Sequence, residues 1–216
     1  MAVETRRNYT RLLIIIPAIG LSALLLFIIT VLLVLTGHAT AFDHAVDGWL
    51  TDPGQKGIQF LHSVSFFGSS KFVIGCYVAL VAGLLVRREN FAATVTALSG
   101  IMGWLSVGLL KRALHRTRPP MPLVEPLTNY SLPSGHACSG FLLYSLLAYF
   151  LWHSPIPRLA KIILVALLFL FSYFIGLTRI YLQLHHASDI IAGFFLAIFF
   201  SCVSIGIMER KKLISK

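Results

Sequence analysis

Charged side chains are scarce in this sequence, and acidic ones are especially few. Asp, Glu, Lys and Arg make up 12% of the 216 residues, only 8 residues are acidic, and 57% are hydrophobic. Soluble domains usually contain about 25% charged residues, and disordered chains contain few hydrophobic ones. The mean hydropathy of +0.82 therefore excludes both classes and predicts an integral membrane protein.

Cysteine is also rare, and no repeat, low-complexity tract or linker divides the chain. Cys76, Cys138 and Cys202 lie far apart in apolar segments, without CxxC spacing. That pattern indicates neither a zinc site nor a disulfide framework. We expect a single membrane-embedded domain over residues 1–216, with no metal and no cofactor.

Long apolar runs define the fold class. A membrane-spanning helix needs about 20 apolar residues. The first run is too long for a signal peptide and lacks a small-residue cleavage site, so we expect it to remain as a helix. The segment from Gly37 to Ser70 is amphipathic in parts and predicts short helices along the membrane interface. The sequence thus predicts an all-α bundle of six transmembrane helices, at residues 12–35, 71–86, 91–110, 137–152, 160–177 and 190–208.

The basic residues indicate the orientation. The net charge is +10, but the 18 Lys and Arg lie almost wholly between the apolar runs. That placement indicates that the basic residues set the membrane topology and contact lipid headgroups, and do not bind nucleic acid. More of them lie on the side of the N-terminus, which predicts a multi-pass protein of the cell membrane with both termini cytoplasmic. The residues on that side are Arg6, Arg7, Arg11, Arg87, Arg88, Arg158, Lys161, Arg210, Lys211, Lys212 and Lys216.

Two loops between predicted spans, both on the opposite side of the membrane, contain residues that could bind an anion or take part in catalysis. The first contains Lys111 and Arg118 and ends in PSGH, residues 133–136. Ser134 can cap the next helix, and Gly135 allows a ligand to approach the backbone. A helix N-terminus with nearby cations binds anions. A basic loop that only holds lipid headgroups would have the same composition, so this connection alone leaves both interpretations open.

The second connection favours catalysis. His185 precedes Asp189 by four residues, so the two share a face if the sixth helix begins that early. A carboxylate in that position orients an imidazole. His136 and His185 could divide proton transfer and nucleophilic attack between them. His186, three residues before Asp189, competes with His185 for the second role.

These residues resemble the three motifs of the type 2 phosphatidic acid phosphatase family. KRALHRTRP at 111–119, PSGH at 133–136 and TRIYLQLHHASD at 178–189 have the family's spacing and order, with Thr178 where the family usually has Ser. The resemblance implies that His185 is the nucleophile, Asp189 its orienting partner and His136 the general acid. It also implies a set of phosphate-binding residues, namely Lys111, Arg118, Ser134, Gly135 and Arg179.

The sequence therefore predicts a membrane phosphatase with an extracytoplasmic site and a phosphohistidine intermediate. Its expected substrate is a lipid phosphate monoester such as phosphatidylglycerophosphate or phosphatidic acid, and a polyprenyl diphosphate is the alternative. The expected binding partners are the bilayer and this substrate. We expect the protein to bind no nucleic acid and to need no obligate protein partner. A non-enzymatic lipid-binding or transport protein remains possible at this stage. So does a metalloenzyme that uses His136, His185, His186 and Asp189, although no HExxH motif is present and three nearby cations would repel a divalent ion.

Overall fold

The computed structural model describes the backbone of residues 2–214 and the side chains of residues 13–214. Within that part it contains helices and no strand. The side chains of Arg6, Arg7 and Arg11, together with all of Lys216, lie outside the described part. The helices are α1 (Ala2–Leu35), α2 (Thr40–Trp49), α3 (Gly54–Ser65), the short 3-10 helix η1 (Phe66–Gly68), α4 (Ser70–Val86), α5 (Asn90–Leu114), α6 (Gly135–Trp152), α7 (Arg158–Tyr181) and α8 (Ala187–Ile214).

Six helical segments are long and apolar enough to cross a membrane, which confirms the predicted all-α architecture. Several extend beyond the predicted spans. The third was expected at 91–110 and the fifth at 160–177, whereas α5 continues to Leu114 and α7 to Tyr181. The prediction stopped at the last apolar residue, but backbone hydrogen bonding continues through the polar residues beyond it.

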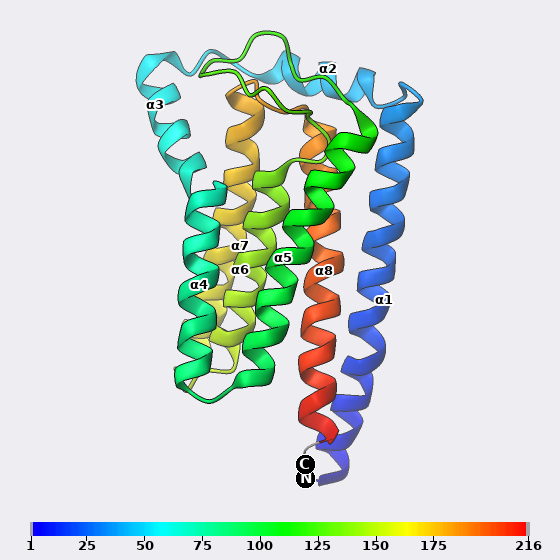
Figure 1. Cartoon of the computed structure of the whole chain (residues 1–216), viewed down its shortest axis with the longest axis vertical. Coiled ribbons are helices and arrows are strands. Elements are labelled where there is room, and N and C mark those ends of the chain that lie inside the picture. The colour runs from blue at the N-terminus through cyan, green and yellow to red at the C-terminus, as the bar shows by residue number, and fades with distance from the viewer. Residues whose placement is uncertain (1, 215–216) are drawn as a thin grey trace.

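Helices α6 and α8 form the centre of the bundle. They pack against each other, and both contact α5 and α7, while α4 packs on α5 and α6. Helix α1 packs along α8 (Figure 1). The close approach of α8 to α6 requires Gly193, because a Cβ there would lie 2.8 Å from the carbonyl oxygen of Ser134.

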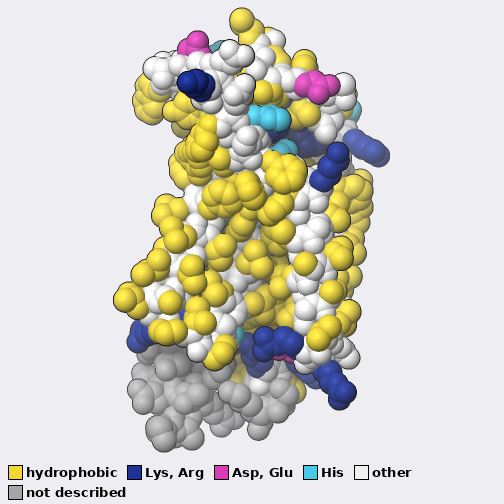
Figure 2. Space-filling view, turned by 90° about the vertical axis from the view of Figure 1, so that its left-hand side faces the viewer, with side chains coloured by type: hydrophobic (Ala, Val, Ile, Leu, Met, Phe, Trp, Pro, Cys, Tyr) yellow, Lys and Arg dark blue, Asp and Glu magenta, His cyan; other side chains and the backbone are white. Residues whose placement is uncertain are grey.

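The outer surface of the bundle is apolar along most of its length. On the face formed largely by α3, α4 and α7, hydrophobic side chains cover the middle, and Lys and Arg side chains gather near the two ends (Figure 2). Lipid rather than water suits such a surface, since an exposed apolar area of this extent is unusual in a soluble protein. The surface therefore agrees with the six candidate spans.

The segment between the first two long helices forms helices, as predicted, but they do not both lie along the interface. Helix α2 lies across one end of the bundle, whereas α3 descends beside it and continues through η1 into α4 (Figure 1). The range Gly54–Val86 as a whole is long and apolar enough to cross a membrane. The apolar positions of α3 are interrupted by polar ones, which is why the sequence alone assigned it to the surface.

The two ends of the bundle differ. Helix α1 begins and α8 ends at one end, which also contains the turn between α4 and α5 (Figure 1). Helix α2 and the long loop of residues 115–134 cover the other end. The two connections that carry the polar motifs both lie there, so the fold brings the predicted site residues to a single end of the molecule.

Candidate active site

Four helices contribute to the candidate site. Lys111 lies in the last turn of α5 and Arg179 in the last turn of α7, while α6 and α8 begin at the site. The loop of residues 115–134 crosses over these helix ends (Figure 1). Helix polarity explains the arrangement, because every second helix of an up-and-down bundle presents its N-terminus at the same end.

The PSGH segment starts α6. The hydroxyl of Ser134 accepts a hydrogen bond from the backbone N–H of Ala137 at 3.4 Å, so Ser134 is the N-cap, as predicted. Its own N–H donates to the backbone carbonyl of Asp189 at 3.0 Å, which ties the two motifs together. A Cβ at Gly135 would meet only Val107, at 3.6 Å, so protein atoms leave room beside this helix N-terminus.

His185 contacts Asp189 with one ring nitrogen and faces Arg118 with the other. The Nδ1 atom lies 3.4 Å from Oδ2 of Asp189, and Nε2 lies 3.1 Å from Nη1 of Arg118. Because a carboxylate only accepts hydrogen bonds, Nδ1 holds the proton, and Nε2 presents its lone pair. Burial lowers the pKa of His185 to about 3, against the opposing effect of Asp189, so the ring is neutral at physiological pH.

The contact between His185 and Asp189 does not arise as the sequence suggested. Helix α8 begins at Ala187, so His185 lies in the loop before the helix, not on a shared helical face. Asp189 reaches back instead, and its Oδ2 accepts the backbone N–H of His186 at 2.9 Å. A carboxylate at this position of the first turn stabilises the helix start, so capping α8 also places Asp189 beside His185.

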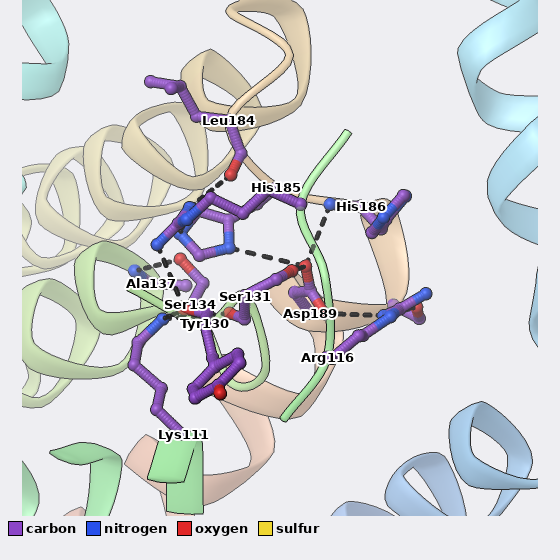
Figure 3. A network of polar contacts seen from close by, with 12 residues as sticks. Lys111, Arg116, Tyr130, Ser131, Ser134, Ala137, Leu184, His185, His186 and Asp189 are labelled. Atoms are coloured by element: carbon purple, nitrogen blue, oxygen red, sulfur yellow. Dashed lines mark hydrogen bonds and ion pairs between the residues drawn. The ribbon is translucent and has the colours of Figure 1, made fainter. Parts of the chain in front are cut away.

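Asp189 is completely buried, with a side-chain exposure of 0%. Besides His185 and the His186 N–H, its carboxylate contacts the hydroxyl of Ser131 and, at 2.5 Å, Nη1 of Arg116 (Figure 3). The other guanidinium nitrogen of Arg116 lies 2.6 Å from Oδ2 of Asp43, in α2. The orientation of Asp189 is therefore fixed by several donors.

Three cations lie within electrostatic range of one another beside His185, and one of them, Arg118, contacts its Nε2 atom. We call Lys111, Arg118 and Arg179 the cation cluster. Lys111 donates to the carbonyl oxygens of Tyr130 and Ser131. Arg179, with 4% exposure, donates from Nη1 to Ser65 at 2.6 Å, and its buried Nε has no hydrogen-bond partner. In the described part of the chain, no member of the cluster forms an ion pair with a carboxylate, so the cluster is an electropositive site.

Arg118 is held by the chain itself. Its guanidinium donates to the carbonyl and side-chain oxygens of Asn129, to the carbonyl of Tyr130 and to the carbonyl of Leu184. Burial lowers its pKa, and Asp189 acts in the opposite direction. The acceptors come from both motif connections, so Arg118 joins the loop of residues 115–134 to the segment before α8.

His136 lies in the first turn of α6, within electrostatic range of His185 and all three members of the cation cluster. It packs against η1, where a Cβ at Gly68 would lie 3.3 Å from its Cδ2. The ring of His186 lies on the other side of Asp189 from the ring of His185 (Figure 3). The described residues contain no group of three or more His, Cys, Asp or Glu that could hold a metal ion.

The sequence-based reasoning missed four residues that shape the site: Asp43, Ser65, Arg116 and Ser131. Arg116 is one of four Lys and Arg residues within the first motif, and nothing in the sequence distinguished its role. Asp43 was visible as an acidic residue in the amphipathic segment AFDHAVDGWL. It is buried in the structure, with 3% exposure, because its partners lie 73 and 145 residues away in the sequence.

Comparison with known proteins agrees with this geometry. The model of the PAP2 superfamily matches residues 88–213, which is more than half of the chain. The chain is 27% identical over 156 residues to phosphatidylglycerophosphatase B of Bacillus subtilis (strain 168), covering 71% of this chain and 76% of that protein.

Two solved structures share the fold. One is a transmembrane PAP2-type phosphatidylglycerolphosphate phosphatase from Bacillus subtilis, with a TM-score of 0.82 and 23% identity, covering 88% of this chain and 96% of that one. The other is LpxE of Aquifex aeolicus, with a TM-score of 0.59 and 22% identity, covering 77% and 93%. With the family match, the six candidate spans and the converging motifs, the chain is a membrane phosphatase of the PAP2 superfamily.

Proposed function

We propose that the protein hydrolyses the phosphate monoester of a membrane lipid, such as phosphatidylglycerophosphate or phosphatidic acid, through a phosphohistidine on His185. One observation carries this proposal. The unprotonated Nε2 of His185, oriented through Nδ1 by Asp189, contacts Arg118 of a cation cluster that forms no ion pair with a carboxylate among the residues whose side chains are described. A nucleophile beside an uncompensated positive site suits attack on a phosphate.

The cation cluster would bind the phosphate oxygens. Phosphoryl transfer depends mainly on positioning and on positive charge around the equatorial oxygens. The unpaired Nε of Arg179 supports this role, since a buried donor without a partner is rare unless a ligand satisfies it. Ser134 and Gly135, at the start of α6, would add donors from a helix N-terminus.

The reaction would proceed in two balanced steps. First, the Nε2 lone pair forms a bond to phosphorus, the bond from phosphorus to the lipid oxygen breaks, and His136 donates a proton to that oxygen. Second, a water oxygen attacks phosphorus, His136 takes a proton from the water, and the electrons of the P–N bond return to Nε2. The products are the lipid alcohol and inorganic phosphate, and His136 begins and ends the cycle as the imidazolium. The Nδ1 proton stays on His185 throughout, and Asp189 accepts its hydrogen bond.

A lipid substrate is supported by the surroundings of the site. The candidate site lies at one end of a six-span bundle, beneath the surface helix α2, where a lipid headgroup can reach it. The names of both Bacillus subtilis relatives specify phosphatidylglycerophosphate. That lipid is therefore the first substrate to assay, followed by phosphatidic acid and a polyprenyl diphosphate.

The test is phosphate release by the protein purified in detergent, with a lipid phosphate and with an aryl phosphate whose phenol is acidic. His185→Ala should abolish activity towards both substrates and prevent formation of an acid-labile phosphoenzyme. His136→Ala should lose on the order of 10² to 10⁴ in rate with the lipid, whose alkoxide leaves poorly without a proton, and much less with the aryl phosphate. His186→Ala, with its ring away from the cluster, should keep most of the activity.

Other outcomes would contradict specific parts of the proposal. A phosphoenzyme that still forms in His185→Ala would move the nucleophile to His186. No phosphate release from any lipid by the wild-type protein would favour a lipid-binding or transport role. Loss of turnover on treatment with EDTA, reversed by zinc or magnesium, would favour a metalloenzyme.

A further inference from the structure

A partly buried arginine joins the surface helix α2 to the catalytic histidine through two carboxylates. Arg116 lies between Asp43 and Asp189, at 2.6 Å and 2.5 Å. The side chains of these two aspartates are 4% and 0% exposed, so each needs a partner in the interior. We call Asp43, Arg116 and Asp189 the arginine bridge.

The arginine bridge controls which way the carboxylate of Asp189 faces. Arg116 takes Oδ1, so Oδ2 is the oxygen that points towards Nδ1 of His185. Ser131 and the His186 N–H donate to Oδ2, and Arg116 occupies Oδ1, so the three donors together set a torsion that is intrinsically broad. Because Asp43 holds the other nitrogen of the Arg116 guanidinium, Arg116 itself is fixed and limits rotation of the Asp189 carboxylate. The bridge thereby keeps Nδ1 protonated and the lone pair on Nε2.

Asp43 fixes Arg116 and the start of α8 at the same time. Its Oδ1 accepts the backbone N–H of Ser188 at 2.9 Å, and its Oδ2 accepts the Ser188 hydroxyl at 2.8 Å. A negative charge at a helix N-terminus is favourable. The helix that carries Asp43 also exposes Phe42 and Trp49, which suit the lipid interface. Asp43 therefore links a membrane-surface helix to the first turn of α8.

We propose that Arg116 and Asp43 are positioning residues for the nucleophile, acting through Asp189 on His185. This inference rests on the proposed function, because it assigns to the bridge the orientation of a nucleophilic His185. Among the described side chains, no hydrogen bond or ion pair joins the bridge to the cation cluster. Its loss should therefore affect the chemical step more than phosphate binding.

The test measures kcat and KM of bridge variants with the lipid phosphate and the aryl phosphate. Arg116→Met should lower kcat by roughly 10- to 100-fold, as expected for the loss of a residue that orients a ligand or base, and change KM little. The fall should be equal for both substrates, because the variant impairs attack and not protonation of the leaving group. Arg116→Lys, which keeps the charge but lacks the two-sided fork, should recover part of the rate.

Matched controls exist nearby. Arg112 is exposed in the last turn of α5, four residues before Arg116 in the following loop, and Asp47 lies one turn after Asp43 in α2. Arg112→Met and Asp47→Asn should leave kcat near the wild-type value, whereas Asp43→Asn should lower it in the same direction as Arg116→Met. If Arg116→Met fails to fold, Arg116→Lys and Asp43→Asn carry the test, since both preserve side-chain size.

The outcomes separate this inference from the proposed function. Bridge variants with wild-type kcat, a change confined to KM, or a loss with the lipid substrate alone would overturn the positioning role. His185→Ala belongs in the same series. Activity retained in His185→Ala would overturn the proposed function, whereas an inactive His185→Ala beside a fully active Arg116→Met would overturn the positioning role alone.

Discussion

The protonation state of His185 decides whether it can act as a nucleophile. Its pKa is lowered to about 3 because burial disfavours the charged ring more strongly than Asp189 favours it. An imidazole in the unfolded chain has a pKa of about 6.5. Between these values the unfolded chain binds a proton that the folded chain does not, so this residue's contribution to stability falls as the pH falls from 6.5 towards 3. At pH 5 the cost is about 2 kcal/mol.

Nuclear magnetic resonance can test this state directly. In protein labelled with ¹⁵N-histidine and free of phosphate, His185 should remain the neutral tautomer with the proton on Nδ1 from pH 5 to pH 8. The signal is identified by its absence in His185→Asn. A His185 signal that titrates with a midpoint near 6.5 would show that burial does not dominate.

The motif residues could be predicted from the sequence because their order and spacing are properties of the chain. Lys111, His136 and His185 do meet at one end of the bundle. Asp43 and Ser65 could not be predicted in the same way, because their partners are set by how α2 and α3 fold back over the bundle. These polar residues belong to the site only because the fold buries them there, and their local sequence does not indicate that they are buried.

At the scale of elements, the contact between α6 and α8 depends on one glycine. A Cβ at Gly193 would lie 2.8 Å from the backbone oxygen of Ser134 and 3.0 Å from Cβ of Ala137. The backbones of two packed helices cannot easily move apart to make room for this methyl group. Gly193→Ala should therefore destabilise the protein by about 1–3 kcal/mol and lower kcat, because α6 carries His136.

Gly206→Ala is the control, because a Cβ there meets only Ile16, at an ordinary 3.6 Å. This variant should be neutral or gain up to about 1 kcal/mol from helix propensity. Thermal unfolding in detergent, together with kcat, measures both effects. Equal melting temperatures for the two variants would mean that the helices separate without cost.

The ends of the elements were the least predictable part of the fold. The apolar pattern located every candidate span, but α5 and α7 run on to include Lys111 and Arg179. Each cation therefore lies on a rigid helix instead of a loop. The path of α3 was also missed, since its departure from the interface depends on packing against α7 and η1.

At the scale of the whole molecule, the orientation predicted from the basic residues would place the candidate site outside the cytoplasm. Glu125, in the loop over the site, and Asn90, at the start of α5, are both exposed and lie at opposite ends of the bundle. In intact cells, Glu125→Cys should react with a membrane-impermeant thiol reagent, whereas Asn90→Cys should react only after the cells are opened. The wild-type protein, with Cys76, Cys138 and Cys202 in its helices, is the background control.

The reverse labelling pattern would place both termini outside and the site in the cytoplasm. That result would not alter the geometry of the site, but it would change which leaflet supplies the substrate. The distribution of basic residues is a property of the whole chain, so no single residue of the site can replace this measurement.

The hydrogen bonds of Arg118 bear on how the enzyme would turn over. In the free protein its guanidinium already donates to oxygens of Asn129, Tyr130 and Leu184. A phosphate that binds Arg118 must displace these oxygens as hydrogen-bond acceptors. Binding therefore exchanges the hydrogen-bond partners of Arg118 and adds few new hydrogen bonds. When inorganic phosphate leaves, the same oxygens accept hydrogen bonds from the guanidinium again, so no donor of Arg118 is left without a partner. Competition from these internal acceptors would weaken product inhibition, and the site would be ready again as soon as it empties.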